Sequence, residues 1–306
     1  MLKPKIAVLM SSYNGEKYIR EQIESILAQK DVDITLYVRD DGSTDDTVGI
    51  IRSYLKNGNV KLLVDGKNLR PGLSFLTLLK KVVKSETEYD YFAFADQDDI
   101  WLDEKLISAV EMIKESEKPA LYCSNQFLYK NGQNEGLRFT DEPDLSLLGH
   151  VSNNDIYGCT MVFDYSIGKK VVESPIPSKS YLDSRCHDSW VFIVSLIFGN
   201  VFYDSRSYIL YRIHESNTVG IKERTLSQRV RRFFKGDIRN IRQECAKLIL
   251  DVFPTVDFPD RCYVEKIAYY KKSFRNRISL MLNTNKCKGR RERKFDYILK
   301  VIMGLV

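Results

Sequence analysis

Three carboxylates follow an apolar run in the stretch Phe92-Ala93-Phe94-Ala95-Asp96-Gln97-Asp98-Asp99-Ile100-Trp101. Similar apolar runs occur at 6–10, 34–38 and 60–64, and helical patterns lie between them, including the leucine-rich segment 73–83. A continuous apolar run is typical of a strand buried on both faces. Because such runs alternate here with amphipathic helices, the sequence predicts the α/β class, with a mostly parallel central sheet flanked by helices.

Polar clusters stand where three of the predicted strands end, at 11–15, 40–43 and 96–99. Each cluster alone is equally well explained as an ordinary turn or helix cap. In open α/β sheets, however, ligands bind outside the carboxyl ends of the strands. The shared position of the clusters therefore predicts a ligand site at this edge.

The carboxylates at 96–99 indicate what that ligand contains. Acidic groups held this close repel one another, and a hard cation such as Mg²⁺ or Mn²⁺ makes the arrangement favourable. The alternative, compatible with the first, is that Asp99 or Asp103 caps a helix over 104–112. A cation with few protein ligands takes the others from phosphates and water, which fits phosphoryl, nucleotidyl or glycosyl transfer. The sequence has neither a P-loop nor a G-x-G-x-x-G turn after its first strand, which disfavours P-loop hydrolysis and dinucleotide redox chemistry.

The second half of the chain is less regular. Residues 131–146 are polar and contain Gly132, Gly136 and Pro143, so we expect a loop or lid there. A strand is expected at 158–163 and an apolar helix over 190–198. The alternation at 201–203 and 208–213 predicts two strands of a hairpin or mixed sheet.

Charge divides the chain into two parts. The 306 residues have a net charge of +6, which excludes an acidic disordered chain and is too small to indicate nucleic-acid binding. Residues 1–220 sum to −7 and residues 221–306 to +13. We therefore expect a catalytic domain over 1–220 and a basic helical extension over 221–306. The six cysteines contain no C-x-x-C pair, so neither a disulfide framework nor a zinc ribbon is expected. No stretch is long and apolar enough for a membrane span or signal peptide, which predicts a cytoplasmic chain.

Three segments together resemble the family 2 inverting glycosyltransferases of the GT-A fold: SSYNGE at 11–16, RDDGSTD at 39–45 and DQDDIW at 96–101. The resemblance extends over about residues 4–220. The DQDDIW form is most similar to bacterial rhamnosyltransferases and related enzymes of capsule or O-antigen synthesis.

The resemblance implies roles for the residues at the strand ends. Ser11, Tyr13 and Asn14 would bind the nucleotide sugar, with Tyr13 stacking near the base. Asp41 would accept from the pyrimidine N–H, whereas Asp40 could instead be a structural acceptor in the turn. Asp96 would contact the ribose or a metal-bound water, and Asp98 would bind the metal, while Asp99 would support the loop or cap a helix.

Later motifs supply the remaining roles. The segment HDSW at 187–190 resembles the family's H-D-x-W, which makes Asp188 the general base; its alternative is a helix N-cap. Gly158 would let the donor or acceptor approach the backbone. In YRIH, at 211–214, Arg212 would face phosphate and His214 would bind the metal or diphosphate, although a lone histidine in a strand is equally well explained as structural. The family's G-N-N after this histidine is replaced by ESN at 215–217.

The basic extension combines cations with apolar residues. This pattern is clearest at 229–242 and 269–278, and 286–294 adds a further cluster of cations. Such interleaving suits the surface of an anionic bilayer. The alternative is a helical subdomain or homodimer interface with a solvated basic face. Nucleic acid is not expected, because no recognised motif is present.

The sequence thus predicts a metal-dependent inverting glycosyltransferase that uses Mn²⁺ or Mg²⁺. Its donor would be dTDP-rhamnose, supplying L-rhamnose, or a UDP-hexose, and its acceptor a bacterial surface polysaccharide or lipid-linked glycan. The enzyme would be peripheral on the inner face of the cell membrane. The alternatives are a metal-dependent nucleotidyltransferase and a catalytically silent module that binds nucleotide sugars or glycans.

Overall fold

The structure, a computed structural model, describes residues 2–214, 240–290 and 292–306. Two compact units are present. The first comprises residues 1–143 and 156–216, and the second comprises residues 144–155 and 217–306. The boundary expected at residue 220 and the basic segment at 229–239 lie outside the described residues.

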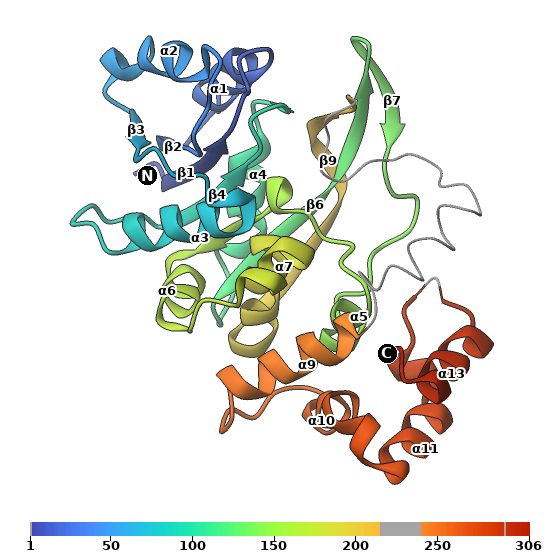
Figure 1. The fold of residues 1–306 in the computed structure, drawn as a ribbon. Helices are drawn as coiled ribbons and strands as arrows, with labels where there is room; N and C mark the ends of the chain where they lie inside the picture. Colours follow the sequence, from blue (N-terminus) through green and yellow to red (C-terminus); the bar gives the residue numbers. More distant parts are fainter. Residues whose placement is uncertain (1, 215–239, 291) are drawn as a thin grey trace. The chain divides into compact units, whose positions relative to one another are not determined.

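A mixed β-sheet forms the centre of the first unit (Figure 1). Its strands are β1 (Lys5–Ser12), β2 (Asp33–Asp40), β3 (Val60–Val64), β4 (Tyr91–Ala95), β5 (Ile100–Trp101), β6 (Ala120–Lys130), β7 (Gln133–Leu137), β8 (Val162–Asp164) and β9 (Asn200–Arg212). The strand order is β3-β2-β1-β4-β8-β6-β9-β5, and β7 pairs with β6. Strands β3, β2, β1 and β4 are mutually parallel, as predicted. Beyond them β8 is antiparallel to both neighbours, β6 and β9 are parallel, and β5 and β7 are antiparallel to their partners.

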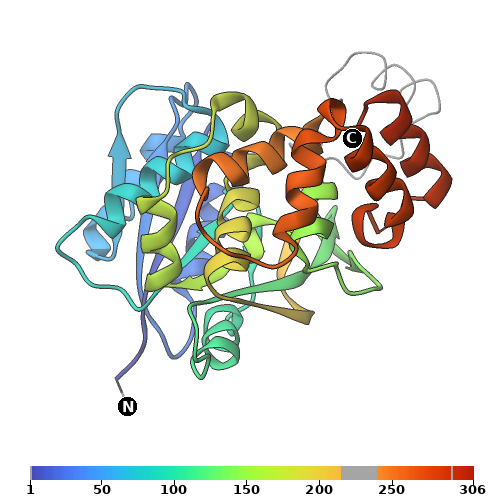
Figure 2. The same cartoon turned by 90° about the horizontal axis from the view of Figure 1, so that it is seen from below.

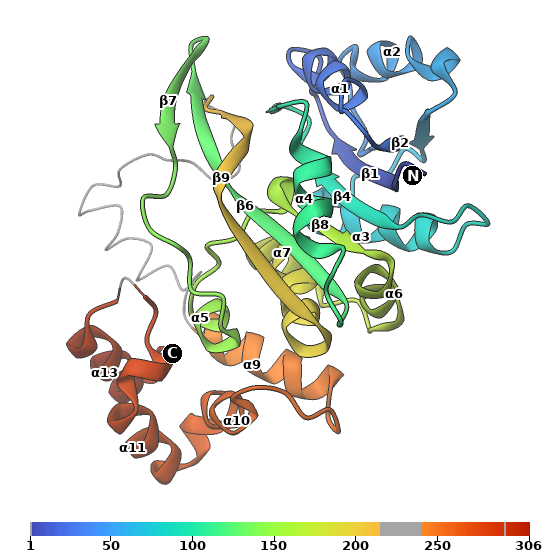
Figure 3. The same cartoon turned by 180° about the vertical axis from the view of Figure 1, so that it is seen from behind.

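Helices cover both faces of this sheet. They are α1 (Ile19–Leu27), α2 (Thr47–Arg52), α3 (Arg70–Val83), α4 (Lys105–Ile113), α6 (Tyr165–Glu173) and α7 (Lys179–Phe198), with the short 3₁₀ turns η1 (Leu55–Asn57) and η2 (Gly158–Thr160). Alternate residues of β1, including Ile6 and Val8, pack in one core with α1, α2 and α4. The opposite face packs against α3, α6 and α7, where Phe94 of β4 contacts Phe75 of α3. Figures 2 and 3 show these two helical layers on opposite sides of the sheet.

The prediction of a loop or lid over 131–146 is wrong for part of this segment. Residues Gln133–Leu137 form β7, which pairs with β6 around a tight turn. Asn131 and Gly132 both have positive φ in this turn (50° and 82°). An Asn-Gly pair favours this conformation, so the turn residues were a hairpin signal.

Other local predictions need correction. Residues 200–212 form one continuous strand that changes register against β6 near Ser207, and not a hairpin. Helix α4 begins after Glu104, so neither Asp99 nor Asp103 is its N-cap.

The second unit is helical. It contains α5 (Leu147–Ser152), α9 (Ile241–Val252), α10 (Arg261–Tyr269), the 3₁₀ turn η3 (Tyr270–Lys272), α11 (Phe274–Leu282), α12 (Thr284–Cys287) and α13 (Lys294–Met303). Buried Ile249, Ile267 and Tyr297 belong to its interior. Arg242, expected on a solvated basic face, is instead buried and paired with Glu292 at 2.9 Å. Over the described residues, no helix combines the length and the apolar character required to cross a bilayer.

Candidate active site

The three predicted polar clusters meet at one edge of the sheet. Ser12 of β1 lies opposite Asp40 of β2, and Met10 of β1 lies opposite Ala95 of β4, so the loops after these strands are neighbours. Gln97 joins two of these loops directly. Its Oε1 accepts from the Tyr13 N–H at 2.9 Å and its Nε2 donates to the Tyr13 carbonyl at 3.0 Å. The three clusters expected at the carboxyl ends of these strands therefore do lie next to one another.

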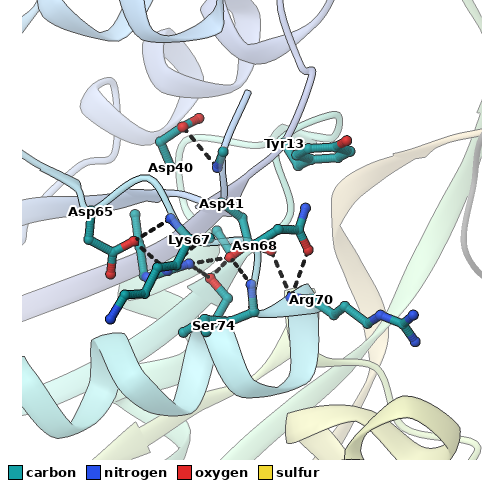
Figure 4. A network of polar contacts seen from close by, with 12 residues as sticks. Tyr13, Asp40, Asp41, Asp65, Lys67, Asn68, Arg70 and Ser74 are labelled. Atoms are coloured by element: carbon teal, nitrogen blue, oxygen red, sulfur yellow. Dashed lines mark hydrogen bonds and ion pairs between the residues drawn. The ribbon is translucent and has the colours of Figure 1, made fainter. Parts of the chain in front are cut away.

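Asp40 and Asp41 have different environments. Asp40 accepts from the N–H groups of Gly42 (3.1 Å) and Ser43 (3.0 Å), so it closes the turn that follows β2. Asp41 is buried and accepts from the N–H groups of Leu69 and Arg70, each at 2.8 Å (Figure 4). The Asp41 carboxylate thus ties the end of β2 to the start of α3.

Arg39 is a central residue of this network that the sequence analysis did not single out. Its guanidinium is fully buried and pairs with the carboxylate of Asp41. It also donates to Ser74 Oγ (2.9 Å), Asp65 Oδ1 (2.8 Å) and the Lys67 carbonyl (3.0 Å). Burial alone would raise the pKa of Asp65, but hydrogen bonds from the Lys67 N–H and Arg39 hold it below its usual range. The sequence signal that could have indicated Arg39 was a positive charge at the end of an otherwise buried strand.

The first loop combines fixed backbone with one exposed ring. Ser11 Oγ lies 2.6 Å from Ser74 Oγ, which connects β1 to the Arg39 network. Asn14 has a positive φ of 48°, and its side chain accepts from the Thr44 N–H at 2.8 Å. The Tyr13 side chain is 48% exposed, and Figure 4 shows its ring near the Asp41 network. A ring on such a fixed backbone is available for stacking.

The acidic cluster after β4 has two parts. Asp98 Oδ2 lies 2.7 Å from His214 Nε2, although the two residues are 116 positions apart in the chain. Asp96, Asp99 and the Cys159 thiol form a second group, whose ligand atoms all lie within 4.8 Å of one another. Burial and the neighbouring charges of Asp98 and Asp188 raise the pKa of Asp96 to about 7. Carboxylates and one imidazole that meet in this way form a donor set suited to a divalent cation.

Arg212 holds this cluster against β9. Its N–H donates to Asp99 Oδ1 at 3.1 Å, and its Nε donates to the Asp98 carbonyl at 2.8 Å. Its guanidinium also pairs with Glu21 of α1 and lies 4.6 Å from the centre of the Tyr18 ring. Arg212 thus places a positive charge beside Asp98 and His214.

Asp188 lies beside Gly158, the glycine expected to let the donor or acceptor approach the backbone. The Gly158 N–H donates to Asp188 Oδ2 at 3.0 Å, and the Ser189 N–H donates to Oδ1 at 2.7 Å. A Cβ at position 158 would lie 2.8 Å from His187 Nε2, so only glycine fits without a shift. Asp188 is close enough to Asp96 to raise its pKa, so it faces the acidic cluster.

Cys186 gives Asp188 its direction. Helix α7 begins after its N-cap Ser178, but its backbone is non-helical at Cys186 (φ 63°, ψ 178°), so Asp188 lies in the first turn of a second helical segment. That conformation is strongly disfavoured for a residue with a side chain. His187 follows, with its ring stacked on Phe75 at 4.0 Å. Burial lowers the pKa of this imidazole to about 3, so His187 is neutral and acts as packing.

A buried lysine lies behind the cluster and was also missed. Lys105 is fully buried, and its Nζ lies 3.8 Å from the centre of the Trp101 ring. This nitrogen has no hydrogen-bond partner among the residues that the structure describes. Burial lowers its pKa to about 7. No local sequence signal distinguishes Lys105 from a solvated lysine at a helix start.

A family model described as "Glycosyl transferase family 2" matches residues 7–167. A dTDP-rhamnosyl transferase, RfbG of Shigella flexneri, is 30% identical over 218 residues, which cover 69% of this chain and 73% of the relative. A UDP-Glc:alpha-D-GlcNAc-diphosphoundecaprenol beta-1,3-glucosyltransferase, WfaP of Escherichia coli, is 25% identical over 190 residues, which cover 62% of this chain and 70% of WfaP. Among solved structures, residues 1–349 of TarS from S. aureus in complex with UDP-GlcNAc match with a TM-score of 0.60 and 20% identity, covering 99% of this chain and 82% of the other.

Proposed function

The chain belongs to glycosyl transferase family 2 and has the GT-A fold, and from this we propose that it transfers a sugar from a nucleoside diphosphate to a bacterial surface polysaccharide or lipid-linked glycan. The observation that carries the proposal is the convergence of Asp96, Asp98, Asp188 and His214 at the edge where the parallel strands end. Acceptor activation and leaving-group stabilisation both need charged groups at one place.

The nucleotide would bind over the loops after β1 and β2. We assign base stacking to the exposed ring of Tyr13 and place Ser11 and Asn14 in the walls of this subsite. Asp41 Oδ2 accepts one hydrogen bond, from the Arg70 N–H. Because a carboxylate oxygen accepts more than one hydrogen bond, it can also accept from the pyrimidine N–H. Asp96 would contact the ribose or a metal-bound water.

A divalent cation, Mn²⁺ or Mg²⁺, fits the residues present. Asp98 and His214 would hold it, since their ligand atoms already lie 2.7 Å apart and both side chains are partly exposed. Positive charge there would relieve the repulsion among the carboxylates of the cluster. When bound, the cation would stabilise the departing diphosphate. Arg212 adds a positive charge beside the same position.

Asp188 would act as the general base of a single displacement. Two backbone N–H groups hold its carboxylate in place, one hydrogen bond to each oxygen. His187 takes the space that a side chain at Gly158 would need, so Gly158 would contribute only its backbone to binding of the donor or acceptor. Attack of the acceptor hydroxyl on the face opposite the nucleotide inverts the anomeric centre.

The donor and acceptor are proposed by likeness. We propose dTDP-rhamnose as donor, because of the 30% identity to a dTDP-rhamnosyl transferase, with a UDP-hexose as alternative because of the likeness to WfaP. The acceptor would be a growing capsule or related glycan on a lipid carrier. A lipid-linked acceptor places the enzyme in the cytoplasm and peripherally on the inner membrane face. The catalytic domain would extend over 1–220 and the basic extension over 221–306, which serves membrane association or, alternatively, a homodimer.

The test is product analysis with dTDP-rhamnose and UDP-glucose, Mn²⁺ or Mg²⁺, and a lipid-linked acceptor. Release of dTDP or UDP together with a glycosylated product of inverted configuration is expected. Asp188→Asn should lower turnover by about 10² to 10⁴ and leave the donor-induced thermal shift unchanged. Asp183→Asn is the matched control, because Asp183 is in the same helix α7 and forms an ion pair with Arg70. Release of pyrophosphate would indicate a nucleotidyltransferase, and donor binding without turnover would indicate a silent module.

A further inference from the structure

Helix α11 exposes an apolar stripe. Phe274, Ile278 and Leu282 are spaced by four residues, which places them on one face of the helix. Phe274 and Leu282 are 76% and 78% exposed. On the other side of the helix Leu280 is fully buried. The second unit therefore uses one face of α11 for its own core and leaves an apolar face in contact with solvent.

Helix α13 repeats this arrangement. Phe295, Leu299 and Ile302 follow helical spacing and are exposed, Phe295 by 72%. Tyr297 and Val301 of the same helix are buried. Helices α11 and α13 pack against each other within the second unit, as Figures 1 and 3 show. The two exposed stripes are thus carried by neighbouring helices.

This concentration is unusual for a solvated surface. Of the fifteen large apolar side chains that are exposed among the described residues, eight lie between residues 269 and 303. Single exposed apolar residues need no explanation, but a concentration of them on two helices that pack together indicates an interaction surface.

Basic residues border both stripes. Residues 269–306 contain eleven Lys and Arg residues and only two acidic ones. Both acidic residues are already paired: Glu292 with Arg242 and Lys300, and Asp296 with Arg293. Exposed Arg275 and Lys294 stand next to Phe274 and Phe295 and form no ion pair with any residue that the structure describes.

We propose that the exposed faces of α11 and α13 form a docking surface for an anionic lipid bilayer. The aromatic and aliphatic side chains would enter the boundary between headgroups and acyl chains, and the bordering cations would contact lipid phosphates. Charge complementarity favours this occupant over a second copy of the chain, because a second copy would bring like charges together. The inference rests on the proposed function in one respect: a lipid-linked acceptor is the reason that the enzyme would encounter a bilayer.

The first test is co-sedimentation of the full-length chain with vesicles of phosphatidylglycerol and phosphatidylethanolamine, compared with pure phosphatidylcholine. Binding to the anionic vesicles that weakens with salt is expected. Phe274→Ser with Phe295→Ser should lower the apparent affinity at least tenfold, since each exposed ring loses its apolar contact with lipid. Leu55→Ser with Ile176→Ser, which removes exposed apolar groups from the first unit, should change it less than twofold.

The cations are tested separately. Arg275→Gln with Lys294→Gln should weaken anionic-vesicle binding by about 25-fold, since each surface cation contributes about fivefold. Lys80→Gln with Lys81→Gln makes the same change in net charge on α3 and should leave binding within twofold. Equal loss in both charge variants would overturn the proposal, because it would show attraction by net charge alone.

A site-specific probe completes the experiment. Trp101 and Trp190 are both buried, so Phe295→Trp introduces the one tryptophan that would report on this surface. A blue shift of its emission on adding anionic vesicles is expected, and no shift would overturn the proposal. The proposal would also be overturned if the Phe274→Ser, Phe295→Ser variant bound vesicles unchanged and sedimentation velocity showed that it converts a dimer to a monomer. That result would assign the surface to a second copy. None of these measurements depends on glycosyl transfer. Absence of vesicle binding would therefore not contradict the proposed activity, and absence of activity would not contradict the proposed lipid surface.

Discussion

Replacing the buried Arg39 tests whether the network behind the nucleotide loops determines stability. The guanidinium makes two ion pairs, one with buried Asp41 and one with Asp65, whose side chain is 34% exposed. Breaking a buried ion pair by removing one partner costs about 3–5 kcal/mol, because the other charge stays buried. Two backbone N–H groups still hold Asp41, so Arg39→Met should lower the free energy of unfolding by about 3 kcal/mol, the lower end of that range.

The assay is urea denaturation followed by tryptophan fluorescence, since both tryptophans are buried. Arg39→Lys keeps the charge but has a single nitrogen head group, so it should recover only part of the loss. Arg39→Met with Asp41→Asn removes both charges and should be more stable than Arg39→Met alone. Two results would refute the reasoning: a loss below about 1 kcal/mol in Arg39→Met, or a double variant whose loss equals the sum of the single losses.

Three further predictions follow from the site. Cys186→Gly should raise the melting temperature and retain activity, whereas Cys186→Val should lower both, because the positive φ of 63° at this position strains any residue with a side chain; calorimetry showing both variants equally stable would contradict this. His214→Ala should abolish the Mn²⁺-induced thermal shift while the apo melting temperature changes little; a retained shift would move the metal away from Asp98. Burial lowers the pKa of Lys105 to about 7, below its ordinary value of 10.5. Above pH 7 the unfolded state therefore binds more protons than the folded state, so the free energy of unfolding should rise from pH 7 to 9. Lys105→Met should flatten this rise in urea titrations, and an equal slope in both proteins would refute the assignment.

Local patterns predicted much of the parallel half of the fold. The apolar runs at 6–10 and 92–95 are strands buried on both faces, where every position needs an apolar side chain. The runs at 34–38 and 60–64 are strands too, with partly exposed positions. The same patterns failed for β7, because the polarity of its residues outweighed the Asn-Gly turn signal. They also failed for β9, because an irregularity in the middle of one strand resembles the turn between two.

Within the candidate site, the sequence singled out residues whose position follows from their own loop. Tyr13, Asp41 and Asp96 each follow a strand end directly, and parallel strands place their ends at one edge. Asp188 and His214 were found through the family resemblance and not through any local periodicity.

The amino-acid sequence by itself therefore determined the strand-end clusters, the family and the division of charge between the two parts of the chain. Only the tertiary structure decided which side chains meet: His214 with Asp98, Gly158 with Asp188, Gln97 with the backbone of Tyr13, and Arg39 with Asp41 and Asp65. The physical reason is that strand register and side-chain direction bring together residues as far as 116 positions apart, which local propensity cannot predict. Packing also determines which apolar residues of α11 and α13 are exposed. The sequence shows that a residue is apolar, but only the tertiary structure shows whether it contacts the core or the solvent.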